Sequence, residues 1–330
     1  MNLKIVALLA TSLLFVACSS KSQFEPKHVG ETLSFSQSMS ASLQDVAREG
    51  ATYHDGMVLS KKRGLLTHKL DKGNRFVYDE GRHILVASAD GLVRVRSEEK
   101  VLFEKRFGSP LASGTIHDDI LALILANNTL ILYDYKQKKE LYKEALEPTF
   151  ANDARLANPI FMDNMVIFPT LDGRLYIIDK VQKRLIRDIA VSSRELFNNI
   201  IFLEEQGDNL VAATASKVLL VSPSGVLEKR MDVKDVLLDK DRIYLFSKTG
   251  RVIKTDFKLK VLAETKFPMA RFSTIMMDDK LYMVEKSGYL IMLDKDLKSK
   301  TVYRLPSEID SPVFAFKKRL FVGSHFLKLR

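Results

Sequence analysis

The stretch Asp172-Gly173-Arg174-Leu175-Tyr176-Ile177-Ile178-Asp179 decides the fold of this chain, because versions of it recur along the sequence. It reads as a tight Asp-Gly turn, a short apolar strand, and an acidic residue where the strand leaves the core. Aligned on Leu175, clear copies centre on Leu130, Val252 and Leu290, and weaker copies on Leu66, Val93, Val218 and Phe326. Such a repeat indicates a fold assembled from similar units.

Each unit contains four candidate strands. Around Leu175 they cover residues 158–162, 165–170, 175–178 and 185–189, with turn residues between them. Most successive copies lie 34 to 45 residues apart, and only the first interval, of 27 residues, is shorter. Four antiparallel strands in a unit of this size are typical of a propeller blade. The sequence therefore predicts an all-β fold, a β-propeller of four-stranded antiparallel blades, with eight blades, or seven if Gly64-Leu65-Leu66 is a spurious copy.

The last unit predicts how the ring closes. It has only three candidate strands, at residues 312–316, 319–322 and 326–329. An outer strand from elsewhere would complete the blade and remove an exposed edge, and residues 33–36 are the available candidate. Between this strand and the regular units, Leu43, Val46 and Ala47 stand at helical spacing, which predicts one short helix within residues 38–49.

The N-terminus predicts an export signal. Residues 1–17 carry one charge, Lys4, followed by an apolar run that is too short to span a bilayer. Phe15-Val16-Ala17-Cys18 resembles a bacterial lipobox, although such motifs usually have Leu where Phe15 stands; the alternative is an ordinary secretory signal with an incidental cysteine. The resemblance implies acylation of Cys18, the only cysteine, and anchoring in the outer membrane, facing the periplasm. Residues 18–30 would then form a flexible tether, and residues 31–330 a single propeller domain.

Composition and charge favour a soluble globular domain. The chain has 330 residues, of which 46% are hydrophobic and 28% charged, and its net charge is +10. Basic residues gather at predicted turns, such as 136–139 and 317–319, where they keep a strand-rich protein soluble. We therefore predict no nucleic-acid partner; weak attraction to an anionic membrane is the alternative.

Motifs of catalysis are absent from the sequence. It has no phosphate loop, no dinucleotide fingerprint and no His-Glu-x-x-His motif, and its six histidines are scattered. The acidic pairs Asp118-Asp119 and Asp278-Asp279 fall in equivalent hairpin turns, so their recurrence marks them as turn formers. We predict no catalytic residues, no metal site and no cofactor.

The repeat resembles that of the PQQ-like β-propellers. In the four clear copies a lysine follows the final aspartate by four residues. These lysines are Lys138, Lys183, Lys260 and Lys298. The family repeat also carries a tryptophan that locks adjacent blades, and this chain has none. Leu141, Leu185, Leu262 and Val302 stand near the corresponding places and are predicted to supply that packing.

Together with the lipobox, the repeat resembles the propeller lipoproteins of the outer-membrane β-barrel assembly machinery. The resemblance implies a non-enzymatic scaffold that assists the assembly and insertion of β-barrel outer-membrane proteins. Its partners would be the barrel-assembly insertase or nascent outer-membrane proteins. One alternative is an envelope scaffold for another secretion, motility or cell-wall machine. A quinone-dependent periplasmic dehydrogenase is less favoured, because such enzymes use an aromatic platform, Ca²⁺ and often a cysteine pair.

Two long links interrupt the repeat, at residues 144–157 and 192–199. Long loops on a rigid ring commonly carry binding sites. The candidate partner-binding residues are Phe150, Arg155, Leu156, Arg194, Leu196 and Phe197. The alternative is that their apolar side chains pack beneath the loops.

Overall fold

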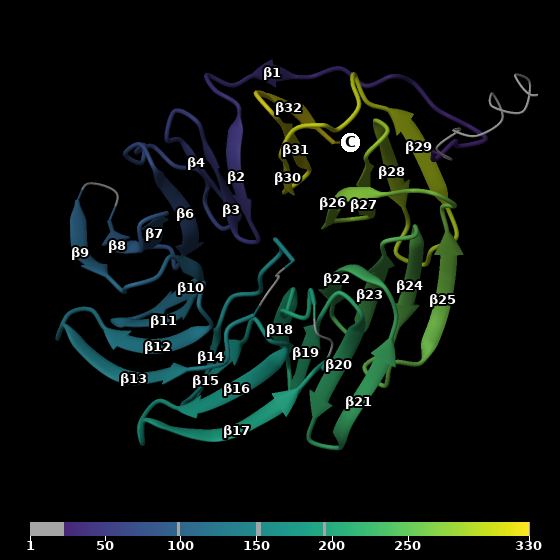
Figure 1. Cartoon of the computed structure of the whole chain (residues 1–330). Coiled ribbons are helices and arrows are strands. Elements are labelled where there is room, and N and C mark those ends of the chain that lie inside the picture. Colours follow the sequence, from purple (N-terminus) through teal and green to yellow (C-terminus); the bar gives the residue numbers. More distant parts are fainter. Residues whose placement is uncertain (1–22, 98–99, 150–152, 194–195, 330) are drawn as a thin grey trace, which may run out of the picture.

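The computed structural model describes residues 23–97, 100–149, 153–193 and 196–329, and all the regular structure in these residues is β. Eight four-stranded antiparallel sheets stand around a central axis as a closed ring (Figure 1). The predicted eight-bladed β-propeller is therefore confirmed. In each blade the chain runs from the inner to the outer strand, except in the last, whose outer strand is β1.

The blades are numbered here in chain order. Blades 1 to 4 contain β2 (Leu43–Ala47), β3 (Gly50–Tyr53), β4 (Val58–Ser60) and β5 (Gly64–Leu65); β6 (Asn74–Asp79), β7 (Ile84–Ser88), β8 (Leu92–Arg96) and β9 (Val101–Arg106); β10 (Leu111–His117), β11 (Ile120–Leu125), β12 (Thr129–Asp134) and β13 (Lys139–Ala145); and β14 (Ile160–Met162), β15 (Met165–Pro169), β16 (Arg174–Asp179) and β17 (Arg184–Ala190). Blades 5 to 8 contain β18 (Phe202–Gln206), β19 (Asn209–Ala213), β20 (Lys217–Ser222) and β21 (Gly225–Arg230); β22 (Val233–Asp239), β23 (Arg242–Ser247), β24 (Arg251–Thr255) and β25 (Val261–Lys266); β26 (Phe272–Met277), β27 (Leu281–Glu285), β28 (Tyr289–Leu293) and β29 (Lys300–Arg304); and β30 (Val313–Phe316), β31 (Arg319–Val322), β32 (His325–Lys328) and β1 (Gln37–Ser38).

The ring closes through a strand near the one predicted. β1 pairs with β32, with Gln37 opposite Phe326, and the Ser36 N–H donates to the Phe326 carbonyl at 2.9 Å. The candidate strand at residues 33–36 was thus placed a few residues early, because Leu33 donates instead to the Arg304 carbonyl of β29 at 2.8 Å.

The predicted helix within residues 38–49 is wrong. Residues 43–47 form strand β2, the inner strand of blade 1. A register shift in its pairing with β3, between Leu43 and Asp45, adds one residue to the strand. Such a β-bulge interrupts the strand alternation, and here the apolar residues take a spacing that imitates a helix.

The weakest copy of the repeat was aligned on the wrong strand. Gly64 and Leu65 form the outer strand β5, whereas the third strand of blade 1 is β4. The turn Asp55-Gly56 precedes β4 as Asp172-Gly173 precedes β16. Realigning this copy on Val58 brings the short first interval into line with the others.

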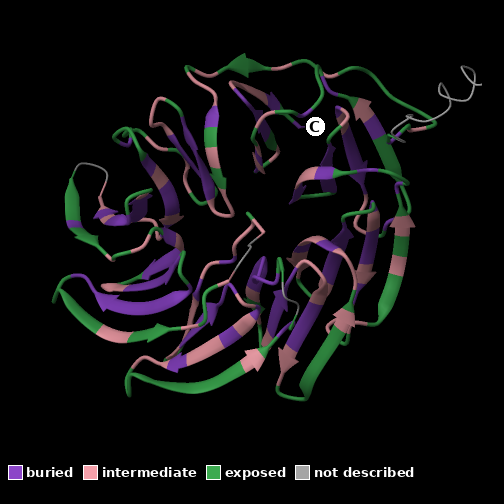
Figure 2. Ribbon diagram, viewed as in Figure 1, coloured by how far each residue is buried: buried purple, intermediate pink, exposed green. Residues whose placement is uncertain are grey.

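The core lies between the blades, where the middle strands face their neighbours. β12 is buried along its whole length, whereas β13, next to it on the outside, has no fully buried residue. The same contrast between buried middle strands and more exposed outer strands repeats around the ring (Figure 2). Burial of these apolar faces against one another stabilises the closed ring.

One backbone hydrogen bond recurs in all eight blades. The donor is the N–H that follows the outer strand, and the acceptor is the carbonyl of the turn residue equivalent to Gly173, at 2.7 to 3.2 Å. The donor and acceptor pairs are Leu70 and Gly56, Phe107 and Gly91, Leu146 and Asn128, Val191 and Gly173, Met231 and Ser216, Phe267 and Gly250, Leu305 and Gly288, and Met39 and Ser324. Every donor residue is apolar, so the same position can pack and hydrogen-bond at once.

Several of these donor residues pack between blades. Val191, Phe267 and Leu305 are buried in clusters shared by two adjacent blades. The prediction that Leu185 and Leu262 supply this packing is wrong, because they are 43% and 45% exposed on the outer strands. Val302 is buried as predicted, and Leu141 is partly buried against the cluster between blades 3 and 4.

The segment before β1 runs along the outside of blade 7. Phe24 is 5% exposed and meets Phe267 and Tyr289 edge to face, with ring centroids 6.3 and 5.6 Å away. Gly30 then donates to the Val302 carbonyl at 2.8 Å. Part of the segment interpreted as a tether is therefore packed against the ring.

Candidate functional site

The two long loops lie at the same end of the blades. Residues 146–159 connect β13 to β14, and residues 191–201 connect β17 to β18, so each joins an outer strand to the next inner strand. Connections of this type in a propeller all emerge on one face of the ring. We call this end the loop face. It also carries the turns between the second and third strands of each blade.

Buried asparagines fasten the two loops to one another. Asn199 is fully buried; its side-chain oxygen accepts from the Asp153 N–H at 2.6 Å, and its amide donates to the Arg155 carbonyl at 2.8 Å. Asn198 donates to the carbonyls of Asp172 and Ser192 at 2.6 and 2.9 Å. The loops are therefore held on the Asp-Gly turn of blade 4 and on each other.

Leu196 and Phe197 project from the second loop and are each 53% exposed. They border a hollow of about 450 Å³ whose other walls are Asp153, Ala154, Ala215, Ser216 and Lys248. Phe197 has φ +51°, a conformation that large side chains seldom adopt. Backbone strain of this kind persists only where the surrounding structure imposes it, and it is common at functional sites. Phe197 is therefore a candidate binding residue.

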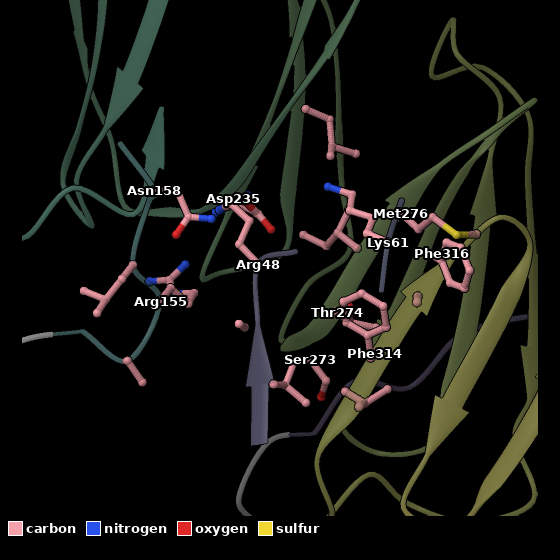
Figure 3. Close-up of a pocket in the computed structure, with 18 of the residues that line it drawn as sticks. Arg48, Lys61, Arg155, Asn158, Asp235, Ser273, Thr274, Met276, Phe314 and Phe316 are labelled. Carbon is pink, nitrogen blue, oxygen red and sulfur yellow. The ribbon is translucent and has the colours of Figure 1, made fainter. Parts of the chain in front are cut away.

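The inner strands enclose a central channel of about 840 Å³. Its lining is divided chemically. Charged residues from the first loop and from blades 1, 5 and 6 include Arg48, Arg155, Glu204 and Asp235, whereas Met276, Phe314 and Phe316 of blades 7 and 8 give an apolar wall (Figure 3). The channel therefore offers both a polar and an apolar surface to anything that enters from the loop face.

Arg48 joins opposite parts of the ring inside the channel. It follows β2 in blade 1, yet its guanidinium donates to Asp235 Oδ1 of blade 6 at 3.1 Å and to the Ile201 carbonyl (Figure 3). It also lies 5.3 Å from the ring centroid of Phe202. Burial works to lower the pKa of Arg48, but the charges of Asp235 and Glu204 raise it overall. Arg48 therefore stays positively charged.

Glu204 and Lys234 are the other perturbed groups of the channel. Burial raises the pKa of Glu204 above its usual value, although Lys61 and Arg48 work against that shift. Burial, followed by the nearby Arg155 charge, lowers the pKa of Lys234. Asp153 accepts from Arg155 Nε at 2.9 Å; despite its own burial, this bond holds the pKa of Asp153 below the ordinary value.

The structure brings four of the predicted residues to the channel and its mouth. Arg155 and Leu156 line the channel, and Leu196 and Phe197 line the neighbouring hollow, with Ala154 contributing to both. Leu156 also packs against the cluster between blades 3 and 4, as the alternative interpretation of the loops had it. Phe150, Arg194 and the acylation candidate Cys18 lie outside the described residues.

Sequence reasoning missed the charged groups that come from the strands. Arg48 fell in the supposed helix, and nothing in the repeat distinguished Glu204 from the many other acidic residues. Lys234 and Asp235 sit at a register shift in β22, between Val233 and Asp235, which sequence alternation alone does not reveal. A charged residue at the start of an inner strand was the one available signal.

The described residues contain no group of three or more His, Cys, Asp or Glu side chains placed to hold a metal ion. Within the same residues, no helix has the length and apolar character needed to cross a membrane.

Comparison with known sequences finds relatives for part of the chain. No family model matches it. It is 35% identical over 229 residues to the plasminogen-binding protein PgbB of Helicobacter pylori strain J99, which covers 65% of this chain and 42% of that protein. PgbB of strain 26695 is 34% identical over 228 residues, again covering 42% of its length. The chain thus spans less than half the length of these curated relatives.

Comparison with solved structures concerns the fold. BamB from Moraxella catarrhalis superposes with a TM-score of 0.68 at 13% identity, covering 88% of this chain and 99% of BamB. The computationally designed Ika8 protein gives a TM-score of 0.67 at 12% identity, and the C-terminal WD40 domain of Sif2 gives 0.66 at 12%. They cover 91% and 92% of this chain, respectively, and all of each other chain. The described chain is therefore a BamB-like β-propeller with eight blades.

Proposed function

We propose that the protein is a non-enzymatic scaffold lipoprotein of the outer membrane, facing the periplasm, which docks a protein partner on its loop face. The observation that carries the proposal is the position of Leu196 and Phe197, two half-exposed apolar side chains on a loop pinned by Asn198 and Asn199. Exposed apolar side chains on a rigid, polar-rimmed surface are typical of protein-binding sites.

The proposed partner is the barrel-assembly insertase or its nascent outer-membrane clients. Support comes from the lipobox-like motif at Cys18 and from the BamB-like fold over most of the chain. In-cell photocrosslinking tests this directly, with benzoylphenylalanine placed at position 196 on the loop face. A matched probe at Val261, 43% exposed on the outer strand β25, reports contacts made by the rim of the ring.

We expect the probe at position 196, and not the one at 261, to capture a periplasmic domain of the insertase or an unfolded barrel protein. If neither is ever recovered, the barrel-assembly role is wrong. Recovery of a secretion, motility or cell-wall component would support the alternative envelope scaffold, and crosslinks from position 261 alone would place the docking surface on the rim.

The anchor is tested separately. The substitution Cys18→Ala removes the only thiol of the chain. We expect the wild-type protein to label with a palmitate analogue and to fractionate with outer membranes, and the variant to be released in soluble form. A variant that stays in the membrane fraction would contradict lipid anchoring.

A second candidate function is plasminogen binding, favoured by one observation, the 35% identity with PgbB over 229 residues. If the shared region of PgbB carries that activity, the purified protein should bind immobilised plasminogen saturably in surface plasmon resonance. Absence of saturable binding would exclude it. The enzymatic alternative is tested by adding a quinone cofactor and Ca²⁺, after which we expect no bound chromophore and no alcohol oxidation.

A further inference from the structure

Three basic side chains meet where the channel opens toward the loop face. They are Arg155 on the first long loop, Lys234 at the start of β22, and Lys248 on the turn after β23. In the described part of the chain, the Lys234 and Lys248 ammonium groups have neither an ion-pair nor a hydrogen-bond partner, and Arg155 Nη1 is buried without one. Asp153 and Asp235, the carboxylates whose charges act on Lys234, are bonded to Arg155 and Arg48.

Lys234 reaches this position through a feature of its strand. It is the extra residue at the register shift between Val233 and Asp235. The same shift in β2, β10 and β26 leaves Gln44, Ala112 and Ser273 at the equivalent position. Bulges redirect a side chain out of the regular alternation. Among these four equivalent inner strands, only blade 6 uses the bulge to place a cation at the channel.

Lys234 is partly buried, and a cation that loses hydration without gaining a partner is costly, so the arrangement favours a ligand that brings negative charge. Burial and the neighbouring charges of Arg155 and Lys248 lower the pKa of Lys234, although Asp235 and Asp153 oppose that shift. An anion placed between these groups would remove their mutual repulsion and satisfy the free donors of Lys234 and Arg155.

The apolar side chains beside the cations limit further which kind of ligand the site can bind. Lys248 lines the same hollow as Leu196 and Phe197, and Ala154 forms part of both this hollow and the channel. A free inorganic anion would use only the cations. A peptide that carries carboxylates next to apolar side chains would use both parts of the surface.

We propose that Lys234, Lys248 and Arg155 bind the acidic side chains of a peptide segment in the docking partner, while Leu196 and Phe197 hold an adjacent aromatic or aliphatic side chain. The proposal rests on the protein-docking function above and specifies what kind of segment docks. Recognition combines charge-assisted hydrogen bonds for orientation with apolar contact for affinity.

Calorimetric titration with a capped peptide of alternating aspartate and phenylalanine tests the proposal on the full chain. The termini are blocked so that only side-chain carboxylates are available. We expect at least tenfold weaker binding when asparagine replaces aspartate, and likewise when serine replaces phenylalanine. Inorganic phosphate alone serves as the probe for a simple anion site and should bind far more weakly.

The substitutions Lys234→Gln and Lys248→Gln should each weaken the peptide about tenfold. Lys280→Gln is the matched control, because Lys280 is exposed in the hairpin between β26 and β27, at the other end of the blades. Lys234→Gln removes a partly buried charge that has no partner among the described residues, so the thermal midpoint of the variant should not fall. Lost binding then cannot be ascribed to unfolding.

Binding that survives both substitutions would overturn the proposal, and so would equal binding of phosphate and peptide. The in-cell crosslink separates this outcome from failure of the docking function. If position 196 captures a partner equally well in wild type and in the Lys234→Gln, Lys248→Gln double variant, docking stands and the acidic-segment proposal falls. If wild type captures nothing while the peptide binds as described, the docking function is what fails.

Discussion

Arg48 Nη2 lies 3.1 Å from Asp235 Oδ1, so that a side chain of the first blade is bonded to one of the sixth across the channel. The two side chains are only 15% and 22% exposed. Blades in a propeller otherwise contact their immediate neighbours, and this bond adds a link between distant parts of the ring.

Arg48→Met should therefore lower the free energy of unfolding by about 2 to 3 kcal/mol, because it leaves Asp235 without its cationic partner and the Ile201 carbonyl without its side-chain donor. Urea denaturation followed by circular dichroism measures the change. Arg82→Met is the control, since Arg82 is exposed in the turn between β6 and β7 and should shift the value by less than about 0.5 kcal/mol. Equal effects of the two substitutions would argue against a role for the cross-channel bond.

Gly250→Ala should disrupt the recurring turn link. A Cβ at Gly250 would lie 2.1 Å from the Phe267 carbonyl oxygen, and the residue has φ +81°. Gly73 has nearly the same φ, +84°, but open space around it, so Gly73→Ala measures the backbone strain alone. We expect a loss of about 1 kcal/mol for Gly73→Ala and at least about 3 kcal/mol for Gly250→Ala, measured by thermal and urea unfolding. Similar losses would mean that the turn can move away from the loop.

Asp279 should make stability depend on pH in the acid range. The Lys318 ammonium, 2.9 Å away, and then the Tyr282 hydroxyl lower the pKa of Asp279 from 3.8 to about 2. Since the folded pKa is the lower one, this contribution is fully present above pH 4 and disappears as the pH falls toward 2. Asp279→Asn should lower the melting temperature at pH 6 but have little effect near pH 2.

The neighbouring substitution Asp278→Asn gives the matched control for Asp279, because Asp278 is exposed and has no ion pair among the described residues. Melting temperatures of the two variants are compared with wild type from pH 2 to 6. A wild-type minus Asp279→Asn difference that stays constant across this range would contradict the proposed linkage.

Phe197→Asn should separate stability from binding. Asparagine tolerates positive φ better than phenylalanine, and Phe197 is half exposed, so little burial is lost. We expect unchanged or slightly raised stability, by less than about 1 kcal/mol, together with a weaker crosslink from the loop face. Leu196→Asn is equally exposed but has no positive φ, and should give the same loss of partner without the gain. A large destabilisation by Phe197→Asn would show that the Phe197 side chain stabilises the fold rather than being held for binding.

Much of the fold was predictable because the repeat is local. Seven of the eight copies were aligned on the correct third strand, since an apolar strand after a turn recurs regardless of its surroundings. Blade 1 was misaligned because β4 has only three residues and β5 only two. Neither strand therefore shows the long apolar run that marks the third strand in the other blades. The helix prediction failed at β2 because a bulge, which pairing with β3 determines, altered the apolar spacing.

The site was predictable only where the sequence departs from the repeat. The two long links directed attention to Arg155, Leu156, Leu196 and Phe197, which do meet at the loop face. Arg48 and Asp235 are separated by most of the chain and become neighbours only through ring closure. No local pattern could reveal that contact, nor the direction in which the bulge turns Lys234.

Phe24 is packed against Phe267 and Tyr289 and so fixes one end of the N-terminal segment to the ring. This contact sets the length of chain available between Cys18 and the propeller. If Cys18 carries the proposed lipid, only five residues lie between the acylated cysteine and Phe24, and these six steps reach at most about 22 Å. Phe24 lies beside Phe267, whose N–H makes the recurring hydrogen bond to the Gly250 carbonyl at the same end of the blades as the two long loops. This short segment would therefore hold the channel mouth close to the lipid head groups, within reach of partner domains that emerge from the same membrane.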